Sequence, residues 1–480
     1  MSFFSEIAFE AGVVARSLME FLQGGGLRLG VTGLSKAGKT VFITALINNL
    51  IAGTRMPVLG ASAEGRILRA HLDPQPDDAV PRFPYEEHLA SLGGPDRHWP
   101  QSTRRISQLR LTIEFERASG WTAGSHTLNL DIVDYPGEWL LDLPLLEKDY
   151  AQWSRETIAA SRTPARAPLA EDWRALLATL DPAAPADEDA ARAAATLFTA
   201  YLRRARDDIY ALSTLPPGRF LMPGDLEGSP ALTFAPLDLS EDSEIASGSL
   251  AAMMERRYEA YKTHVVRPFF RDHFSRLDRQ IVLVDALTAL NSGPAALRDL
   301  EDALSEVLNA FRAGRASTFA SIFRPRVDRI LFAATKADHL HHSSHDRLEA
   351  ILRTLTSRAI ARAEGVGAEI DVIALAAIRA TREAQIRHGG ETLDAIIGIP
   401  EAGEKLGGQV FDGVAEAAVF PGQLPEDPTS VFSGDRIALP EAENDWRFLR
   451  FRPPMVTRKG APPHIRLDRA MQFLIGDKLA

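Results

Sequence analysis

The sequence predicts an α/β fold: a mostly parallel sheet with helices on both faces, a large helical insertion, and a small, irregular C-terminal extension. Apolar runs typical of strands alternate with helical patterns, an order that favours parallel pairing. Between about 140 and 278, helical patterns dominate without such strands. The predicted strands are Leu27–Thr32, Leu109–Phe115, a run that ends at Asp134, Ile281–Asp285, Ile330–Ala334 and Ile370–Leu375.

Composition narrows the class of protein. The chain has 480 residues, 45% of them hydrophobic, which is enough for a large core or for several domains. Its net charge of −10 disfavours a general nucleic-acid binder, which normally presents a basic face. The absence of cysteine excludes disulfides and thiolate chemistry and fits a reducing cytoplasm. No apolar run approaches the ~18 residues of a membrane span. We therefore expect a cytoplasmic protein.

The stretch GLSKAGKT, residues 33–40, fits the pattern G-x-x-x-x-G-K-[ST] between a strand-type run and an apolar helical run. This context predicts a P-loop, in which backbone N–H groups and the helix dipole bind phosphate. Lys39 would reach the β- and γ-phosphates, and Thr40 would bind Mg²⁺. The predicted nucleotide contacts of this segment are Gly33, Ser35, Lys36, Ala37, Gly38, Lys39, Thr40 and Val41.

A second motif, DYPGE at 134–138, fits D-x-x-G directly after an apolar strand. An Asp at the carboxyl end of a strand can hold Mg²⁺ through water, which is the role predicted for Asp134. Gly137 would bring its N–H to the γ-phosphate and move when that phosphate leaves.

A third motif, TKAD at 335–338, predicts which base is bound. The Asp338 carboxylate can accept hydrogen bonds from N1–H and the N2 amino group of guanine, a donor pair that adenine lacks. The stem of Lys336 would cover the face of the base. Backbone N–H groups after the next strand would meet the guanine O6, and we assign this role to Ala376, Ala377 and Ile378. The expected ligands are therefore GTP or GDP with Mg²⁺.

The order of these motifs resembles the plan of Ras-like GTPases. The segments GLSKAGKTVFITALI, DIVDYPGEWLLDLPLL, RQIVLVDAL, ALNSGP and the final FLIGDKL more specifically resemble the YcjX family of bacterial stress-associated P-loop GTPases. The resemblance implies hydrolysis of GTP to GDP and phosphate and a link to envelope or phage-shock stress. It also implies a membrane-protein partner, which could hold a cytoplasmic protein at the inner membrane.

The predicted catalytic residues are Lys36, Lys39, Thr103, Gly137 and Glu138. Glu138 stands where many relatives of Ras place Gln, and its charge would repel the γ-phosphate, so a low intrinsic rate is expected. Lys36 is either a cationic helper or a solvent-facing lysine, and an arginine could take the helper's part instead. Thr103, with Ser102 and Thr112 as alternatives, is the predicted switch I ligand. The predicted Mg²⁺ ligands are thus Thr40, Thr103 and Asp134.

Two further features receive plainer interpretations. HLHHSSH, residues 339–345, places four histidines in one loop without a carboxylate at a fixed spacing, so we predict a solvated loop rather than a metal site. Asp285 ends a strand, where we expect a helix cap or a hydrogen bond at the sheet edge.

We expect five segments along the chain. The first lacks the basic front of a signal peptide, and a packed helix is favoured over one on a membrane surface. In order they are an N-terminal amphipathic helix (1–26), the first part of a GTPase domain (27–139), a helical insertion (140–278), the second part of the GTPase domain (279–387) and a C-terminal extension packed on that domain (388–480).

The predicted function is a guanine-nucleotide switch in which the insertion reports the bound state. The main alternative is a scaffold that binds GTP and barely hydrolyses it. An ATPase is a third alternative, and it requires TKAD to be an incidental turn.

Overall fold

The structure is a computed structural model. It describes residues 26–33, 37–75, 77–101, 105–118, 124–206, 212, 216–239, 245–309, 327–364, 367–388, 390–406, 408–433, 448–456 and 460–480. The predicted N-terminal helix lies outside the described residues, apart from Gly26, where the first strand begins.

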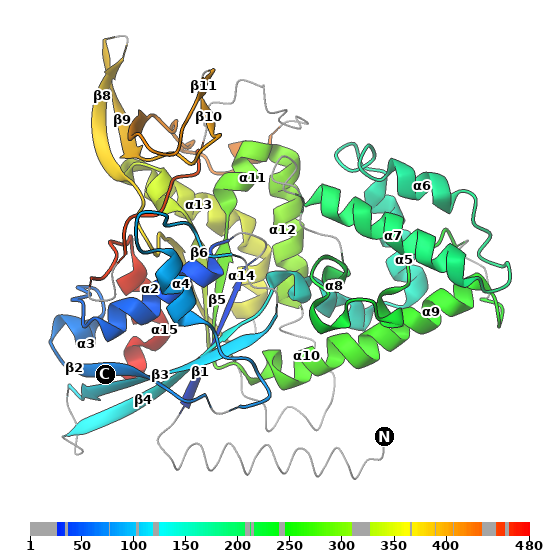
Figure 1. Cartoon of the computed structure of the whole chain (residues 1–480), viewed down its shortest axis with the longest axis horizontal. Coiled ribbons are helices and arrows are strands. Elements are labelled where there is room, and N and C mark those ends of the chain that lie inside the picture. Colours follow the sequence, from blue (N-terminus) through cyan, green and yellow to red (C-terminus); the bar gives the residue numbers. More distant parts are fainter. Residues whose placement is uncertain are drawn as a thin grey trace.

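A seven-stranded sheet forms the centre of the molecule, in the order β2-β3-β4-β1-β5-β6-β7 (Figure 1). The pairs from β4 through β1, β5 and β6 to β7 are parallel, and only β2 and β3 add antiparallel pairs at one edge. The predicted α/β class with a mostly parallel sheet is confirmed. The strands are β1 (Gly26–Gly33), β2 (Ile67–Asp73), β3 (Ser107–Glu116), β4 (Ser125–Asp134), β5 (Arg279–Val284), β6 (Arg329–Ala334) and β7 (Glu369–Ala374).

The strands β5 to β7 are buried on both faces, and alternate residues pack on opposite layers. Ile281, Leu331 and Ile373 face the layer of α2 (Lys39–Ile51) and α15 (Leu467–Ile475). Their neighbours Val282, Phe332 and Val372 face the opposite layer. That layer holds α11 (Ala286–Ser292), α12 (Pro294–Asn309) and α13 (His345–Leu355). The α/β part of the chain also contains the shorter helices α3 (Gly60–Ala63), α4 (Tyr85–Ser91) and α14 (Ser357–Glu364).

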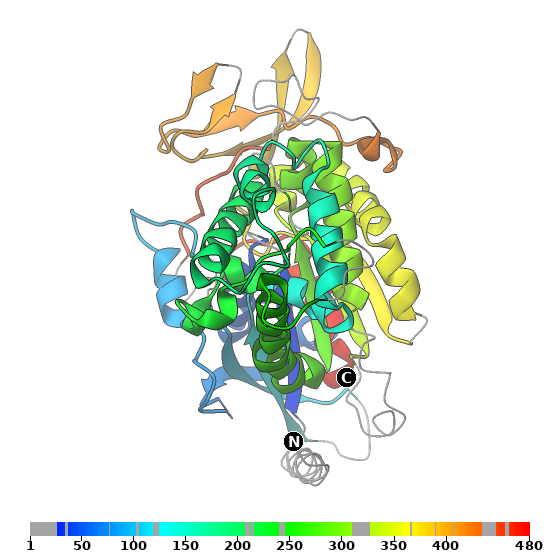
Figure 2. The ribbon, with the colours of Figure 1, turned by 90° about the vertical axis from the view of Figure 1, so that its right-hand side faces the viewer.

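The chain between β4 and β5 is helical, as the sequence predicts. It forms its own aromatic core, in which Trp153 stacks on Tyr258 with ring centroids 5.0 Å apart and Trp173 stacks on Tyr201 at 5.6 Å. Figure 2 shows these green helices in front of the sheet. They are α5 (Tyr150–Ser161), α6 (Glu171–Leu177), α7 (Glu188–Ala205), α8 (Gly218–Leu221), α9 (Leu250–Tyr261) and α10 (Arg267–Asp272), preceded by the 3₁₀ segment η1 (Gly137–Glu147).

The C-terminal part contains a second, small antiparallel sheet. Its strands are β8 (Arg382–His388), β9 (Glu391–Gly398) and β12 (Ala417–Val419), and a short hairpin pairs β10 (Lys405–Leu406) with β11 (Gln409–Val410). The final α-helix of the chain is α15. It packs on the main sheet, where Arg279 of β5 donates to Asp477 just beyond it (2.8 Å). The division into five segments stays a prediction, and its boundary at 388 falls at the end of β8.

Among the described residues, no helix is both long and apolar enough to cross a membrane.

Candidate nucleotide-binding site

A cavity of about 290 Å³ lies at the carboxyl edge of the sheet, where β1, β6 and β7 end. Parallel strands direct their following loops to the same edge, which is where ligands bind in open α/β sheets. Two of the motifs and the segment after β7 meet there, since the wall includes Ala37, Gly38, Lys39, Thr40, Val41, Lys336, Asp338, Ala376, Ala377 and Ile378.

The P-loop begins where β1 ends. A Cβ atom on Gly33 would lie 2.5 Å from the Leu283 carbonyl oxygen and 2.9 Å from the Ala37 Cβ, so only glycine fits this curl. Gly38 has φ +82°, a left-handed conformation that glycine adopts freely. The Lys39 ammonium donates to the Gly33 carbonyl (3.0 Å), which folds the lysine over the loop. Ser35 and Lys36 lie outside the described residues, so their roles stay predictions.

The predicted base-binding edge follows β6 and β7. Asp338 is only 4% exposed, and its Oδ2 accepts a hydrogen bond from the Ala380 N–H (2.8 Å). The Thr381 hydroxyl donates to the Asp338 carbonyl, which fixes the turn a second time. The Ala376 N–H donates to the Ile465 carbonyl (3.1 Å), so it is directed at α15's entry rather than at a base. The predicted contact to O6 therefore depends on Ala377 and Ile378.

The D-x-x-G segment leads from β4 into the insertion. Asp134 is buried at the end of β4, level with Val31 of the neighbouring β1. Gly137 opens η1, and the next residue, Glu138, is buried and forms an ion pair with Arg206 at the end of α7. The side chain predicted to act near the attacking water is thus held by the insertion in this structure.

The three residues predicted as possible switch I ligands have different outcomes. Thr103 and Ser102 lie outside the described residues, and the Thr40 hydroxyl is 3.5 Å from the carbonyl of nearby Gln101. The alternative Thr112 is wrong: it lies mid-strand on β3, opposite Asn129, and its hydroxyl donates to Asp73 of β2. It is five residues from Ser107, the β3 residue beside Asp134, so at about 3.4 Å per residue it is roughly 17 Å from that end of the sheet.

A family model described as the YcjX-like family, DUF463, matches residues 27–479. The chain belongs to the YcjX-like family. It is 40% identical over 465 residues to a protein of Escherichia coli strain K12 named Ras-like GTPase YcjX, with 94% of this chain and 96% of that one covered. A protein of the same name from Shewanella oneidensis is 34% identical over 484 residues, with 94% of each chain covered. The resemblance seen in the motifs is confirmed.

In this YcjX-like chain, the cavity wall also contains residues that motif reasoning missed. Five of them come from the segment before switch I and from the C-terminal part, and these two parts meet where the Trp99 indole N–H donates to the Phe451 carbonyl (2.7 Å). The ring of Phe451 also meets that of His339 at 5.4 Å. The missed wall residues are Phe42, Trp99, Pro100, Thr335, His339, Leu375, Glu401, Arg450 and Phe451.

Lys336 is held by a carboxylate on the neighbouring strand end. It has φ +61°, and its ammonium is 2.5 Å from Asp285 Oδ2. Asp285 also caps α11, because it accepts from the Thr288 N–H (3.1 Å) and hydroxyl (2.7 Å), which confirms the predicted cap. Burial raises the pKa of Asp285, but Lys336 and Thr288 outweigh it and leave the pKa below its ordinary value.

Replacing Asp285 by Ala should therefore lower the free energy of unfolding by about 2 kcal/mol, because the cap and the charged partner of Lys336 are lost together. Urea unfolding measures the loss. Asp187→Ala is the matched control, since Asp187 caps α7 through two backbone N–H groups far from the cavity and should cost only about 1 kcal/mol. Equal losses in the two variants would mean that the Lys336 pair adds nothing.

Proposed function

We propose that this protein binds guanine nucleotides with Mg²⁺, hydrolyses GTP slowly to GDP and phosphate, and changes conformation with the bound nucleotide. The supporting observation is a single cavity whose wall carries both the P-loop Lys39 and the buried carboxylate of Asp338. The relatives from Escherichia coli and Shewanella oneidensis are named Ras-like GTPases, in line with this proposal.

The residues present suit the proposed ligands. The Lys39 ammonium already lies against a carbonyl of the loop, so an anionic phosphate would be a stronger partner for it. Thr40 and Asp134 are buried and offer the oxygen ligands that Mg²⁺ prefers, and Thr103 is the third proposed ligand. When bound, Mg²⁺ would neutralise charge that develops on the phosphates. Asp338, held by the Ala380 N–H, would select guanine.

The contacts after Gly137 suggest how the nucleotide state would reach the insertion. Glu138 pairs with Arg206, and the buried Asp142 accepts from the Tyr261 hydroxyl (2.6 Å) and the Gly218 N–H (2.6 Å). A movement of Gly137 on loss of the γ-phosphate would therefore act on α7, α8 and α9 through these bonds.

Hydrogen exchange tests the switch. We expect the protein bound to a non-hydrolysable GTP analogue and the protein bound to GDP to differ in protection across residues 100–160 and in α8. Identical patterns in the two states would contradict the switch. A parallel titration with ADP separates the proposal from the ATPase alternative, because a guanine-specific site should bind GDP far more tightly.

The second candidate is a scaffold that binds GTP with negligible turnover. One observation favours the scaffold. Glu138 is buried and forms an ion pair with Arg206, and this ion pair would prevent Glu138 from positioning the attacking water.

Single-turnover hydrolysis separates the two candidates. We expect wild type to release phosphate slowly and Lys36→Ala to release it at least about 10-fold more slowly, since a cation near the developing charge is lost. Lys36→Arg, which keeps the charge, is the control. No phosphate release by wild type would favour the scaffold.

Family resemblance further suggests a task in bacterial envelope or phage-shock stress. A membrane-protein partner would then bring a cytoplasmic protein to the inner membrane. Co-fractionation of the protein with membranes, with and without bound GTP, tests this part of the proposal.

A further inference from the structure

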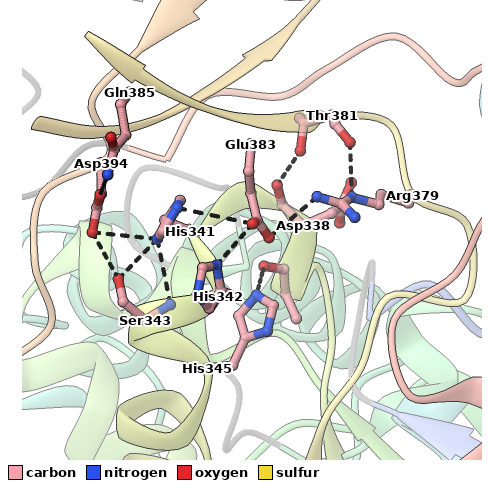
Figure 3. A network of polar contacts seen from close by, with 11 residues as sticks. Asp338, His341, His342, Ser343, His345, Arg379, Thr381, Glu383, Gln385 and Asp394 are labelled. Atoms are coloured by element: carbon pink, nitrogen blue, oxygen red, sulfur yellow. Dashed lines mark hydrogen bonds and ion pairs between the residues drawn. The ribbon is translucent and has the colours of Figure 1, made fainter.

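The histidine loop that follows Asp338 is not the solvated loop that the sequence predicts. His339, His341 and His345 are buried, at 8%, 9% and 4% exposure, and among the four only His342 is exposed. The burial of His345 is accounted for by its hydrogen bond with the Ala337 carbonyl (2.9 Å). His339 is part of the cavity wall. The remaining pair, His341 and His342, turns toward the hairpin of β8 and β9 (Figure 3).

A carboxylate from β8 reaches both histidines. Glu383 Oε2 is 2.8 Å from His342 Nδ1 and 3.8 Å from His341 Nε2. One ligand atom from each of the three residues lies within 4.8 Å of the others. Tetrahedral Zn²⁺ with bonds of about 2.0–2.2 Å places its ligand atoms roughly 3.4 Å apart, so small side-chain rotations would bring this trio to that spacing.

Outer contacts orient two of the three ligands. His341 Nδ1 lies 2.9 Å from the Ser343 hydroxyl and 3.4 Å from Asp394 Oδ2 of β9, which directs Nε2 toward Glu383. The other oxygen of Glu383, Oε1, accepts from Arg379 (3.2 Å) and so leaves Oε2 to the histidines. A carboxylate behind a ligand histidine is the usual arrangement at protein zinc sites, because it fixes the ring and raises its basicity.

We propose that His341, His342 and Glu383 bind a divalent transition-metal ion, with Zn²⁺ as the best match. Two imidazoles and one carboxylate suit Zn²⁺, whereas Mg²⁺ and Ca²⁺ prefer oxygen alone. Three protein ligands leave a fourth position for water, and the exposure of His342 gives the ion access from solvent.

The site would join the histidine loop to the C-terminal hairpin. Asp338 precedes this loop, and the residues that hold Asp338, Ala380 and Thr381, directly precede β8. A metal ion between His341, His342 and Glu383 would therefore fasten β8 to the loop beside the cavity. This consequence concerns stability and does not require that the cavity bind a nucleotide.

Calorimetry with Zn²⁺ on the full chain, freed of any affinity tag, tests the site. We expect about one tightly bound ion per chain in wild type. The double variant His341→Ala, His342→Ala and the single variant Glu383→Gln should lose this binding. Asp394→Asn should weaken it by about 10- to 100-fold, because only an outer contact is removed. The control His98→Ala removes an exposed histidine elsewhere and should bind as wild type does.

Two further measurements distinguish the loss of a metal ligand from misfolding of the variant. Zn²⁺ should raise the melting temperature of wild type and of His98→Ala but not of Glu383→Gln. Substituted Co²⁺ should show the visible absorption of a tetrahedral site only in proteins that keep all three ligands. Absence of binding in wild type, or equal binding in wild type and Glu383→Gln, would overturn the proposal.

Discussion

Asp338→Asn is expected to weaken GDP binding by about 10³- to 10⁴-fold and to confer binding of XDP. The carboxylate would accept two hydrogen bonds from guanine, whereas the amide would present a donor to the N2 amino group of the base. Xanthine carries a carbonyl at that position, so the amide matches it. The expected loss of GDP affinity is large because Asp338 is buried, so a polar group left without a partner there cannot form a hydrogen bond with water instead.

Calorimetry with GDP, XDP and ADP on wild type and variant measures this change of specificity. Gained XDP binding shows that the variant is folded. Asp346→Asn is the control, because Asp346 lies shortly after in α13 and its exposed side chain pairs with Arg466. GDP binding that survives Asp338→Asn, with no gain of XDP binding, would mean that TKAD is only a turn.

The sequence predicted the main sheet and the meeting of GKT with TKAD for one physical reason. The strands β5 to β7 are apolar on both faces, which distinguishes them clearly from their surroundings, and parallel strands bring their following loops to one edge. Edge strand β2 escaped prediction because only Ala70 in it is buried, so it shows no apolar alternation.

Residues from the C-terminal part escaped for a different reason. Glu401, Arg450 and Phe451 reach the cavity only through tertiary packing, and their local sequence resembles an ordinary polar or aromatic stretch. The contacts of the histidine loop escaped prediction for the same reason. Its carboxylate neighbours Glu383 and Asp394 are 41 and 51 residues from the side chains they contact, a separation that no motif spacing reveals.

The second large effect concerns Asp142, which joins the D-x-x-G segment to the insertion. The carboxylate is 2% exposed and accepts from the Tyr261 hydroxyl and from the Gly218 and Arg219 N–H groups. Burial raises its pKa to about 6, although these hydrogen bonds and the charge of Arg219 partly counteract the rise.

Because this pKa is raised, the folded protein between about pH 4 and pH 6 holds a proton on Asp142 that the unfolded chain has already released. The stabilising contribution of protonated Asp142 is therefore complete below about pH 4 and is lost as the pH rises through about 6. Asp142→Asn removes the titration and keeps a group that can accept from Gly218. We expect the variant to gain up to about 3 kcal/mol on wild type between about pH 4 and pH 7.

Urea unfolding of both proteins across that pH range measures the gain. Asp149→Asn controls for the loss of any carboxylate near the insertion, because asparagine preserves the cap that Asp149 provides to α5. Parallel pH profiles for wild type and Asp142→Asn would show that the site is better hydrated than its burial indicates. If the pH profile of Asp142→Asn diverges from that of wild type and the profile of Asp149→Asn does not, ionisation of Asp142 weakens the contact between η1 and the helices α8 and α9 at neutral pH. The segment that the nucleotide is proposed to move would then be held by bonds weak enough to yield.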